Sequence, residues 1–240
     1  MRTTIFAGLL LALPAAPAQA QLAFTLHDCL ADRDDDARLH ICAIISGTEE
    51  QKAHGAVEAA RILRARAEHE AAIDLLNAKG SHALLDAELG HLWFEVGDHL
   101  MADFHFEMAL LRGYEPDRPT RARMAAAAQL YAEELQFSND DPATAMKAYD
   151  RALALDPDTL PALLGRAEAA LKLGRPRDAQ ADLDRAIGLG ADWTGFLFRA
   201  RARQALGDTA GAIADFRRVL EDNPQHSGAR AALADLGAAP

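Results

Sequence analysis

Histidine is the side chain whose number in this sequence first invites a chemical interpretation. Eight of the nine histidines lie between His27 and His105. Two histidines that hold a metal ion from one helix stand three or four residues apart, so that both face the same way. His99 and His105 are six residues apart, and His91 belongs to a different expected helix from His99. The spacing favours solvated or capping histidines, and we predict neither a metal site nor any other cofactor.

The acidic residues Asp32, Asp34, Asp35 and Asp36 raise the question of a calcium site. A calcium loop alternates its ligands, carries a glycine for its turn and closes with a glutamate. This cluster has neither the glycine nor the alternation, whereas carboxylates at the start of a helix stabilise its positive end. We therefore predict a helix start. Nucleophile-elbow, phosphate-loop, dinucleotide and H-E-x-x-H motifs do not occur in the sequence, so we predict that the protein is not an enzyme.

The first twenty residues have the composition of a secretory signal. Arg2 gives a positive start, Ile5 to Leu13 is an almost unbroken apolar run, and Ala18-Gln19-Ala20 has the small-x-small form that signal peptidase cuts. The run is too short to span a bilayer. We expect residues 1–20 to be a signal peptide cleaved near Ala20 and the mature chain to be periplasmic or secreted. The alternative is an uncleaved membrane anchor.

Export bears on Cys29 and Cys42, the two cysteines of the chain. Oxidising compartments pair thiols, so a Cys29–Cys42 disulfide is expected, the alternative being two unconnected buried thiols. A bond that closes so short a loop contributes about 3 kcal/mol in the chain-entropy model. The sequence contains neither the C-x-x-C redox motif nor the C-x-x-C-H haem motif.

The charge balance restricts the partners. The chain has 25 basic and 36 acidic residues. Nucleic acids and anionic membranes need a basic face, so both are disfavoured as partners. We also expect no membrane span in the mature chain. Basic protein segments, and partners that bind through apolar surfaces, remain open.

The helices that would position a functional site follow a pattern that recurs along the chain. A small residue followed four positions later by a large one recurs, as Ala102 with Phe106, Ala145 with Tyr149, Ala179 with Leu183 and Ala212 with Phe216. From Ala145 to Ala179 is 34 residues and from Ala179 to Ala212 is 33. Gly97, Gly174 and Gly207 precede these steps, and Pro157 and Pro224 follow two of them. The apolar positions are expected to be core, with the glycines as helix ends and the prolines as helix stops.

This pattern resembles the tetratricopeptide repeat, a helix-turn-helix unit of 34 residues with the pattern W-x2-L-G-x2-Y…A-x3-F…P. Leu89, Gly90 and Trp93 match its first helix, and the resemblance covers about residues 51–237. It implies an all-α fold, a right-handed α-solenoid of about five repeats. The third repeat departs from the pattern, because extra residues between Tyr131 and Asp141 require a longer first helix or a larger loop.

The resemblance also gives an organisation. After the signal peptide we expect an N-terminal helical cap over 21–50, a repeat array over 51–225, and a C-terminal capping helix and tail over 226–240. First helices are expected near 51–64, 83–96, 119–136, 159–173 and 193–206, and second helices near 68–78, 99–111, 141–154, 176–187 and 209–221. Exported bacterial repeat proteins often begin similarly, with one cysteine before a helix and another inside it. On this reading Cys29–Cys42 pins the N-terminal cap to the array.

Carried over by register, the family's first helices would line a concave groove and hold the ligand contacts. The groove residues so assigned are His54, Arg61, Arg64, His91, Phe94, Glu95, Gln129, Glu133, Glu168, Leu171, Lys172, Arg201 and Gln204. Arg61 and Arg64 would make one end basic, and Glu95, Glu133 and Glu168 would make the middle acidic. No cluster resembles the basic carboxylate clamp that holds chaperone C-termini, so that ligand is not predicted.

Together these features predict a non-enzymatic periplasmic or secreted scaffold that binds a protein or peptide segment in its groove. One alternative is an accessory subunit of an envelope enzyme or assembly complex. Another is a structural envelope protein that associates with peptidoglycan or with itself. The sequence names neither the partner nor the oligomeric state.

Overall fold

The structure, a computed structural model, describes residues 24–31 and 34–239. In this part of the chain the fold is all-α, with 13 helices and no strand. The expected fold class is therefore confirmed. The expected signal peptide and its cleavage site lie outside the described residues.

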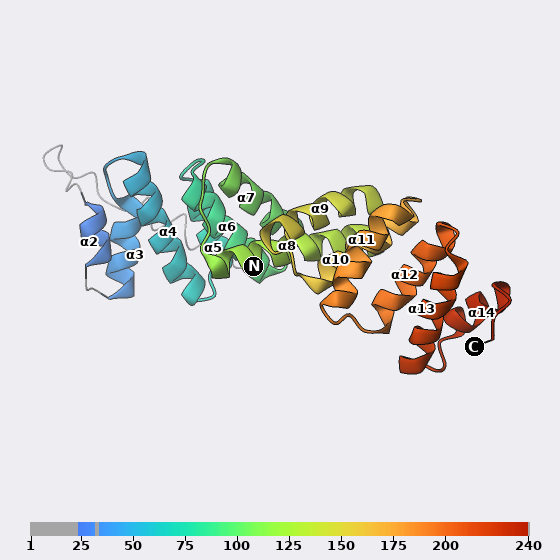
Figure 1. Cartoon of the computed structure of the whole chain (residues 1–240). Helices are drawn as coiled ribbons and strands as arrows, with labels where there is room; N and C mark the ends of the chain where they lie inside the picture. The colour runs from blue at the N-terminus through green and yellow to red at the C-terminus, as the bar shows by residue number, and fades with distance from the viewer. Residues whose placement is uncertain (1–23, 32–33, 240) are drawn as a thin grey trace, which may run out of the picture. The chain divides into compact units, whose positions relative to one another are not determined.

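The helices form two compact units that divide between Glu115 and Pro116. The first unit contains α2 (Leu26–Leu30), α3 (Asp35–Ile44), α4 (Glu49–Ala65), α5 (His69–Asn77), α6 (Ala83–Val96) and α7 (His99–Leu111). The second contains α8 (Arg118–Phe137), α9 (Pro142–Leu155), α10 (Leu160–Lys172), α11 (Pro176–Gly188), α12 (Trp193–Ala205), α13 (Thr209–Asp222) and α14 (Ser227–Asp235). All are labelled in Figure 1.

Within each unit the helices pack as successive pairs. In the first unit α4 packs on α5 and α6 on α7, and α4 also contacts α6. In the second unit α8 packs on α9, α10 on α11 and α12 on α13, while α10 contacts both α8 and α12 (Figure 1). First helices therefore lie beside first helices, as a repeat architecture requires.

The alanine-to-aromatic step forms the core, as predicted. Ala102, Ala145, Ala179 and Ala212 are all fully buried, and so are Phe106, Tyr149, Leu183 and Phe216. In each pair the two residues are four apart and share one helix face, so each second helix presents a small and a large side chain together. These positions are packing residues, which leaves the polar faces of the helices for function.

The helix ends also lie where the sequence predicts them. Gly97 has a φ of 88°, a left-handed conformation that glycine adopts without steric cost, and its backbone N–H donates to carbonyls of the last turn of α6. Helix α8 spans 20 residues, so the extra residues of the third repeat lengthen its first helix. Helix α14 packs Ala229 and Leu233 against Phe216, in agreement with the expected C-terminal capping helix.

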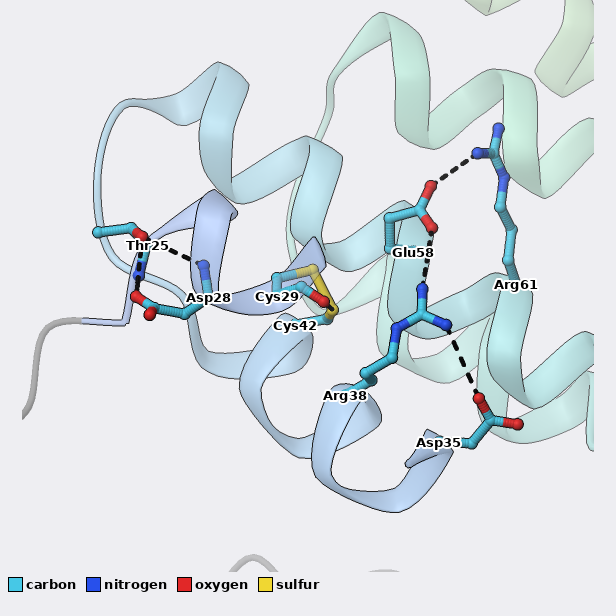
Figure 2. The surroundings of a disulfide bond; sticks show 8 residues. All are labelled: Thr25, Asp28, Cys29, Asp35, Arg38, Cys42, Glu58 and Arg61. Atoms are coloured by element: carbon cyan, nitrogen blue, oxygen red, sulfur yellow. Dashed lines mark hydrogen bonds and ion pairs between the residues drawn. A yellow bond between two sulfur atoms is a disulfide. The ribbon is translucent and has the colours of Figure 1, made fainter. Parts of the chain in front are cut away.

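The N-terminal region carries the expected disulfide, between Cys29 and Cys42 (Figure 2). Asp34 caps α3, and Asp35 and Asp36 lie in its first turn, as predicted from the acidic cluster. Helix α2 was not predicted. It is held by a capping box in which Thr25 accepts from the backbone N–H of Asp28, while the Asp28 carboxylate accepts from that of Thr25 (Figure 2). The disulfide joins this short helix to α3, so it links two helices within the expected cap and, contrary to the prediction, does not pin that cap to the repeat array.

Candidate partner-binding residues

In the first unit two predicted groove residues point at an acid that the sequence analysis missed. Glu88 on α6 is 3% exposed. Arg64 Nη1 donates to its Oε1 at 2.5 Å, and Arg61 Nε donates to its Oε2 at 3.4 Å. Burial raises the pKa of the Glu88 carboxyl, and the two guanidinium groups oppose that rise. Because Glu88 accepts from both arginines, the predicted basic end of the groove is largely neutralised.

The other predicted residues of the first unit contact one another or the core. Glu95 lies 3.7 Å from Arg64 and 3.6 Å from His69. The His91 ring makes an edge contact with the Phe106 ring, with 5.2 Å between centroids. Phe94 makes a similar contact with His99, and His54 is exposed. The structure therefore joins Arg61, Arg64 and Glu95 through charge, whereas His91 and Phe94 lie against other rings.

His105 differs from the expectation of solvated or capping histidines. It is 9% exposed, and its Nδ1 lies 3.3 Å from Oδ1 of Asp86. Arg112 donates to the other carboxylate oxygen of Asp86. His82 and His226, by contrast, cap helices as expected. The only sequence signal for the Asp86–His105 pair is that each interrupts an otherwise apolar helix face.

In the second unit an arginine bridge occurs in two consecutive repeats. Arg166 on α10 makes two hydrogen bonds to Asp182 on α11, of 2.8 and 2.6 Å, and a third of 2.6 Å to Asp150 on α9. One repeat later, Arg199 on α12 bonds Asp215 on α13 and Asp184 on α11 in the same way. Each bidentate pair joins the two helices of one repeat, and the third bond, to Asp150 or Asp184, links that repeat to the preceding one. The charges of these residues are therefore used within the fold.

Two of the predicted groove residues, Glu133 on α8 and Glu168 on α10, lie near one buried phenol, Tyr149 on α9. Gln129 Nε2 donates to Oε1 of Glu133 on α8 at 3.0 Å. The Tyr149 side chain is fully buried, and its hydroxyl has no hydrogen-bond partner among the described residues. Burial raises the pKa of Tyr149, and the nearby carboxylates of Glu133 and Glu168 raise it further. Glu133 and Glu168, which register assigned to one face, are thus brought to the same group.

The remaining predicted residues are dispersed over the second unit. Leu171 packs against buried residues of α10 and α11. Lys172 Nζ lies 3.4 Å from the carbonyl oxygen of Gln136 and 5.5 Å from the centroid of the Phe137 ring. Arg201 lies over the Phe198 ring, and Gln204 is exposed. None of these joins the Tyr149 cluster through a hydrogen bond within the described chain.

The two best-formed hollows of the described chain contain none of the predicted groove residues. One, of about 280 Å³, lies beside Cys42 and is lined by Lys52, Lys79 and His82. The other, of about 560 Å³, lies between α9, α10 and α11. In residues 24–31 and 34–239 no three His, Cys, Asp or Glu side chains stand where they could share a metal ion. No helix there is both long and apolar enough to cross a membrane.

Comparison with known proteins identifies the repeat. Two family models, both described as tetratricopeptide repeat, match residues 136–194 and 199–226. A curated relative, the DnaJ homolog subfamily C member 7 homolog of Schizosaccharomyces pombe, is 28% identical over 61% of this chain. The matched stretch spans about a third, 32%, of that relative's length.

Two solved structures illustrate what the chain is similar to. YrrB, described as a TPR protein with an unusual peptide-binding site, matches 77% of this chain and 94% of its own with a TM-score of 0.53 and 18% identity. The second TPR domain of human RPAP3, solved in complex with an HSP70 peptide, matches 50% of this chain and 98% of its own at 26% identity, with a TM-score of 0.46. The likeness to YrrB supports the helix-pair architecture described above.

Proposed function

The chain is a member of the tetratricopeptide repeat superfamily, and we propose that it is a non-enzymatic scaffold that holds a segment of another protein against its first helices. YrrB, which shares the fold, has a peptide-binding site by its description. Peptide binding is the activity that we carry over to this chain, and an extended or helical segment is the form of ligand that suits a row of helices.

One observation carries this proposal, namely how the acids of the second unit are paired. Asp182 and Asp215 belong to second helices, and arginines of the fold bind both. Glu133 and Glu168 belong to first helices, and within the described residues no lysine or arginine pairs with either. These two first helices, α8 and α10, therefore keep carboxylates that no cation of the described chain pairs with, and such carboxylates are available to a partner.

We further propose that the mature protein is periplasmic or secreted. The first twenty residues support this, because they combine a positive start, an apolar run and a small-x-small cleavage site. The Cys29–Cys42 disulfide also supports it, since such bonds persist in oxidising compartments. Fractionation of cells that express the full chain, with N-terminal sequencing of the product, tests both parts. A product that begins at Met1 in the cytosolic fraction would overturn the proposal.

Site-specific photo-crosslinking tests the binding face. A photo-reactive amino acid is placed at Gln129 or Gln204 on first helices, and at Asp74, an exposed residue of the second helix α5, as the control. Each variant is irradiated in the envelope fraction and its adducts are identified by mass spectrometry. We expect the same partner from both first-helix positions and none from Asp74. Adducts from Asp74 alone would place binding on the second helices and overturn the proposal.

A further inference from the structure

The chemistry at Tyr149 indicates what kind of segment the scaffold holds. We propose that Glu133 and Glu168, which both lie near the buried Tyr149 side chain, bind the guanidinium of an arginine in a basic partner segment. Gln129, Glu133, Tyr149 and Glu168 are together called the acidic face. This inference rests on the proposed function, because it assigns the ligand of the same first helices.

The geometry places three elements around one point. Gly165 and Glu168 are three residues apart on α10 and so share a helix face. A Cβ on Gly165 would lie 2.3 Å from the Tyr149 oxygen, so that oxygen lies directly against this face. Gln129 and Glu133 are four residues apart on α8 and hydrogen-bonded to each other. Helices α8, α9 and α10 pack on one another, and the carboxylates of Glu133 on α8 and Glu168 on α10 both act on the Tyr149 phenol of α9.

The acidic face differs from three buried acids of this chain because no lysine or arginine of the described residues pairs with Glu133 or Glu168. Other acids beside buried positions are bound by arginines: Glu88 by Arg64, Asp182 by Arg166, and Asp215 by Arg199. Lys172, one turn after Glu168, is engaged with the Gln136 carbonyl and the Phe137 ring. Two half-buried carboxylates near one buried phenol, without a cation, are an unfavourable arrangement, and a cation from a partner would relieve it.

Buried polar groups beside these carboxylates also lack partners. The Tyr149 hydroxyl has none, although its residue is fully buried. Gln136, one turn after Glu133 on α8, is 1% exposed, and both polar atoms of its side chain are unpartnered. A buried polar group without a hydrogen bond costs free energy, so such groups call for an explanation. In this structure the phenol bonds neither carboxylate, so it is a donor available to whichever carboxylate turns towards it when a ligand binds.

Two carboxylates, which accept hydrogen bonds, favour a guanidinium among the possible cations. A guanidinium is planar and carries five N–H donors, so it can give hydrogen bonds to both carboxylates at once. A bound metal ion needs more ligands than these two carboxylates, and no third His, Cys, Asp or Glu completes such a group in the described chain. The net charge of −11 also draws a basic segment towards the protein.

The test uses the mature chain and a synthetic heptapeptide of alternating alanine and arginine, with lysine and glutamate versions as probes. Binding is measured by calorimetry at physiological salt. Glu133→Gln with Glu168→Gln should weaken arginine-peptide binding about tenfold. The matched control, Glu70→Gln with Asp74→Asn on α5, removes the same charge. It should change the affinity for the arginine peptide less than about twofold. Tyr149→Phe should weaken binding by about threefold while the melting temperature is retained.

Equal weakening by the two double variants would show bulk charge attraction and overturn the proposal. Equal affinity for the lysine and arginine peptides would overturn the guanidinium assignment. Circular dichroism melting of each variant separates lost binding from lost fold. Photo-crosslinks from Gln204 that survive in the Glu133 and Glu168 variants, together with unchanged arginine-peptide binding, would refute the acidic face alone and leave the proposed function standing.

Discussion

The Tyr149 hydroxyl on α9 occupies space that a side chain at position 165 on α10 would need. A Cβ on Gly165 would lie 2.3 Å from both the Cζ and the hydroxyl oxygen of Tyr149. Gly90 and Phe106 stand in the same relationship in the first unit, with 2.4 Å from the added Cβ to the Phe106 ring. In each unit a glycine of a first helix thus makes room for an aromatic residue of a second helix.

Substitution of Gly165 should therefore destabilise the second unit. Because Tyr149 is fully buried, its ring has no space into which to move, and Gly165→Ala should cost about 1–3 kcal/mol through overpacking. The free energy of unfolding is measured by guanidinium denaturation. In a Tyr149→Leu background, the same alanine should cost clearly less. Equal costs in the two backgrounds would mean that the two residues do not compete for this space.

The raised pKa of Tyr149 predicts a pH dependence of stability. Burial, with the carboxylates of Glu133 and Glu168, raises the pKa of Tyr149 above its ordinary value of 10.0. Above about pH 10 the unfolded chain loses this proton while the native chain keeps it, so the free energy of unfolding falls as the pH rises. Below that pH both states are protonated and the contribution is fully present.

Tyr149→Phe removes this titration and should flatten the decline in the free energy of unfolding above about pH 10. The measurement compares denaturation midpoints of wild type and variant at several pH values. Tyr114 and Tyr131 are present in both proteins, so their titration cancels. Parallel decline in the two proteins would mean that the hydroxyl ionises as readily in the native state as in the unfolded state.

The arginine bridges predict unequal roles for two aspartates that share one arginine. Asp215 is 4% exposed and receives hydrogen bonds from Arg199 and Arg203. Asp215→Ala leaves both guanidinium groups without this acceptor and should cost about 3 kcal/mol. Asp184 bonds the same Arg199 with its side chain half exposed, so Asp184→Ala should cost about 0.5 kcal/mol. Thermal or chemical denaturation of both variants gives the comparison, and similar costs would contradict it.

The disulfide should stabilise the N-terminal end alone. Cys29 and Cys42 are both buried and link α2 to α3 (Figure 2). We expect no free thiol in the unfolded, unreduced protein. Cys29→Ser with Cys42→Ser should cost about 3 kcal/mol in the chain-entropy model. Hydrogen exchange should accelerate in α2 and α3 and remain unchanged in α12 and α13. Faster exchange in α12 would show that the effect is not local.

The sequence predicted most of the helix register because that register depends on residue size. Ala145 and Tyr149 recur in their roles at Ala179 and Leu183, and the structure buries all four. Charge partners were harder to predict. Glu88 and Arg64 are 24 residues apart on different helices, and the repeat register gives the face of each residue but not the rotamer that joins them. Helix α2 was missed because it is only 5 residues long. The other groove assignments stay predictions.

The bridges of Arg166 and Arg199 bear on how the second unit comes apart. Arg166 ties α9 to α11 and Arg199 ties α11 to α13, each through an aspartate of the preceding second helix. In a linear array each repeat contacts only its neighbours, so terminal repeats can fray one at a time. The two consecutive arginine bridges raise the coupling between adjacent repeats. The helices from α9 to α13 should therefore open more cooperatively than unbridged repeats would, while α8, which carries Glu133, lies outside the bridged stretch.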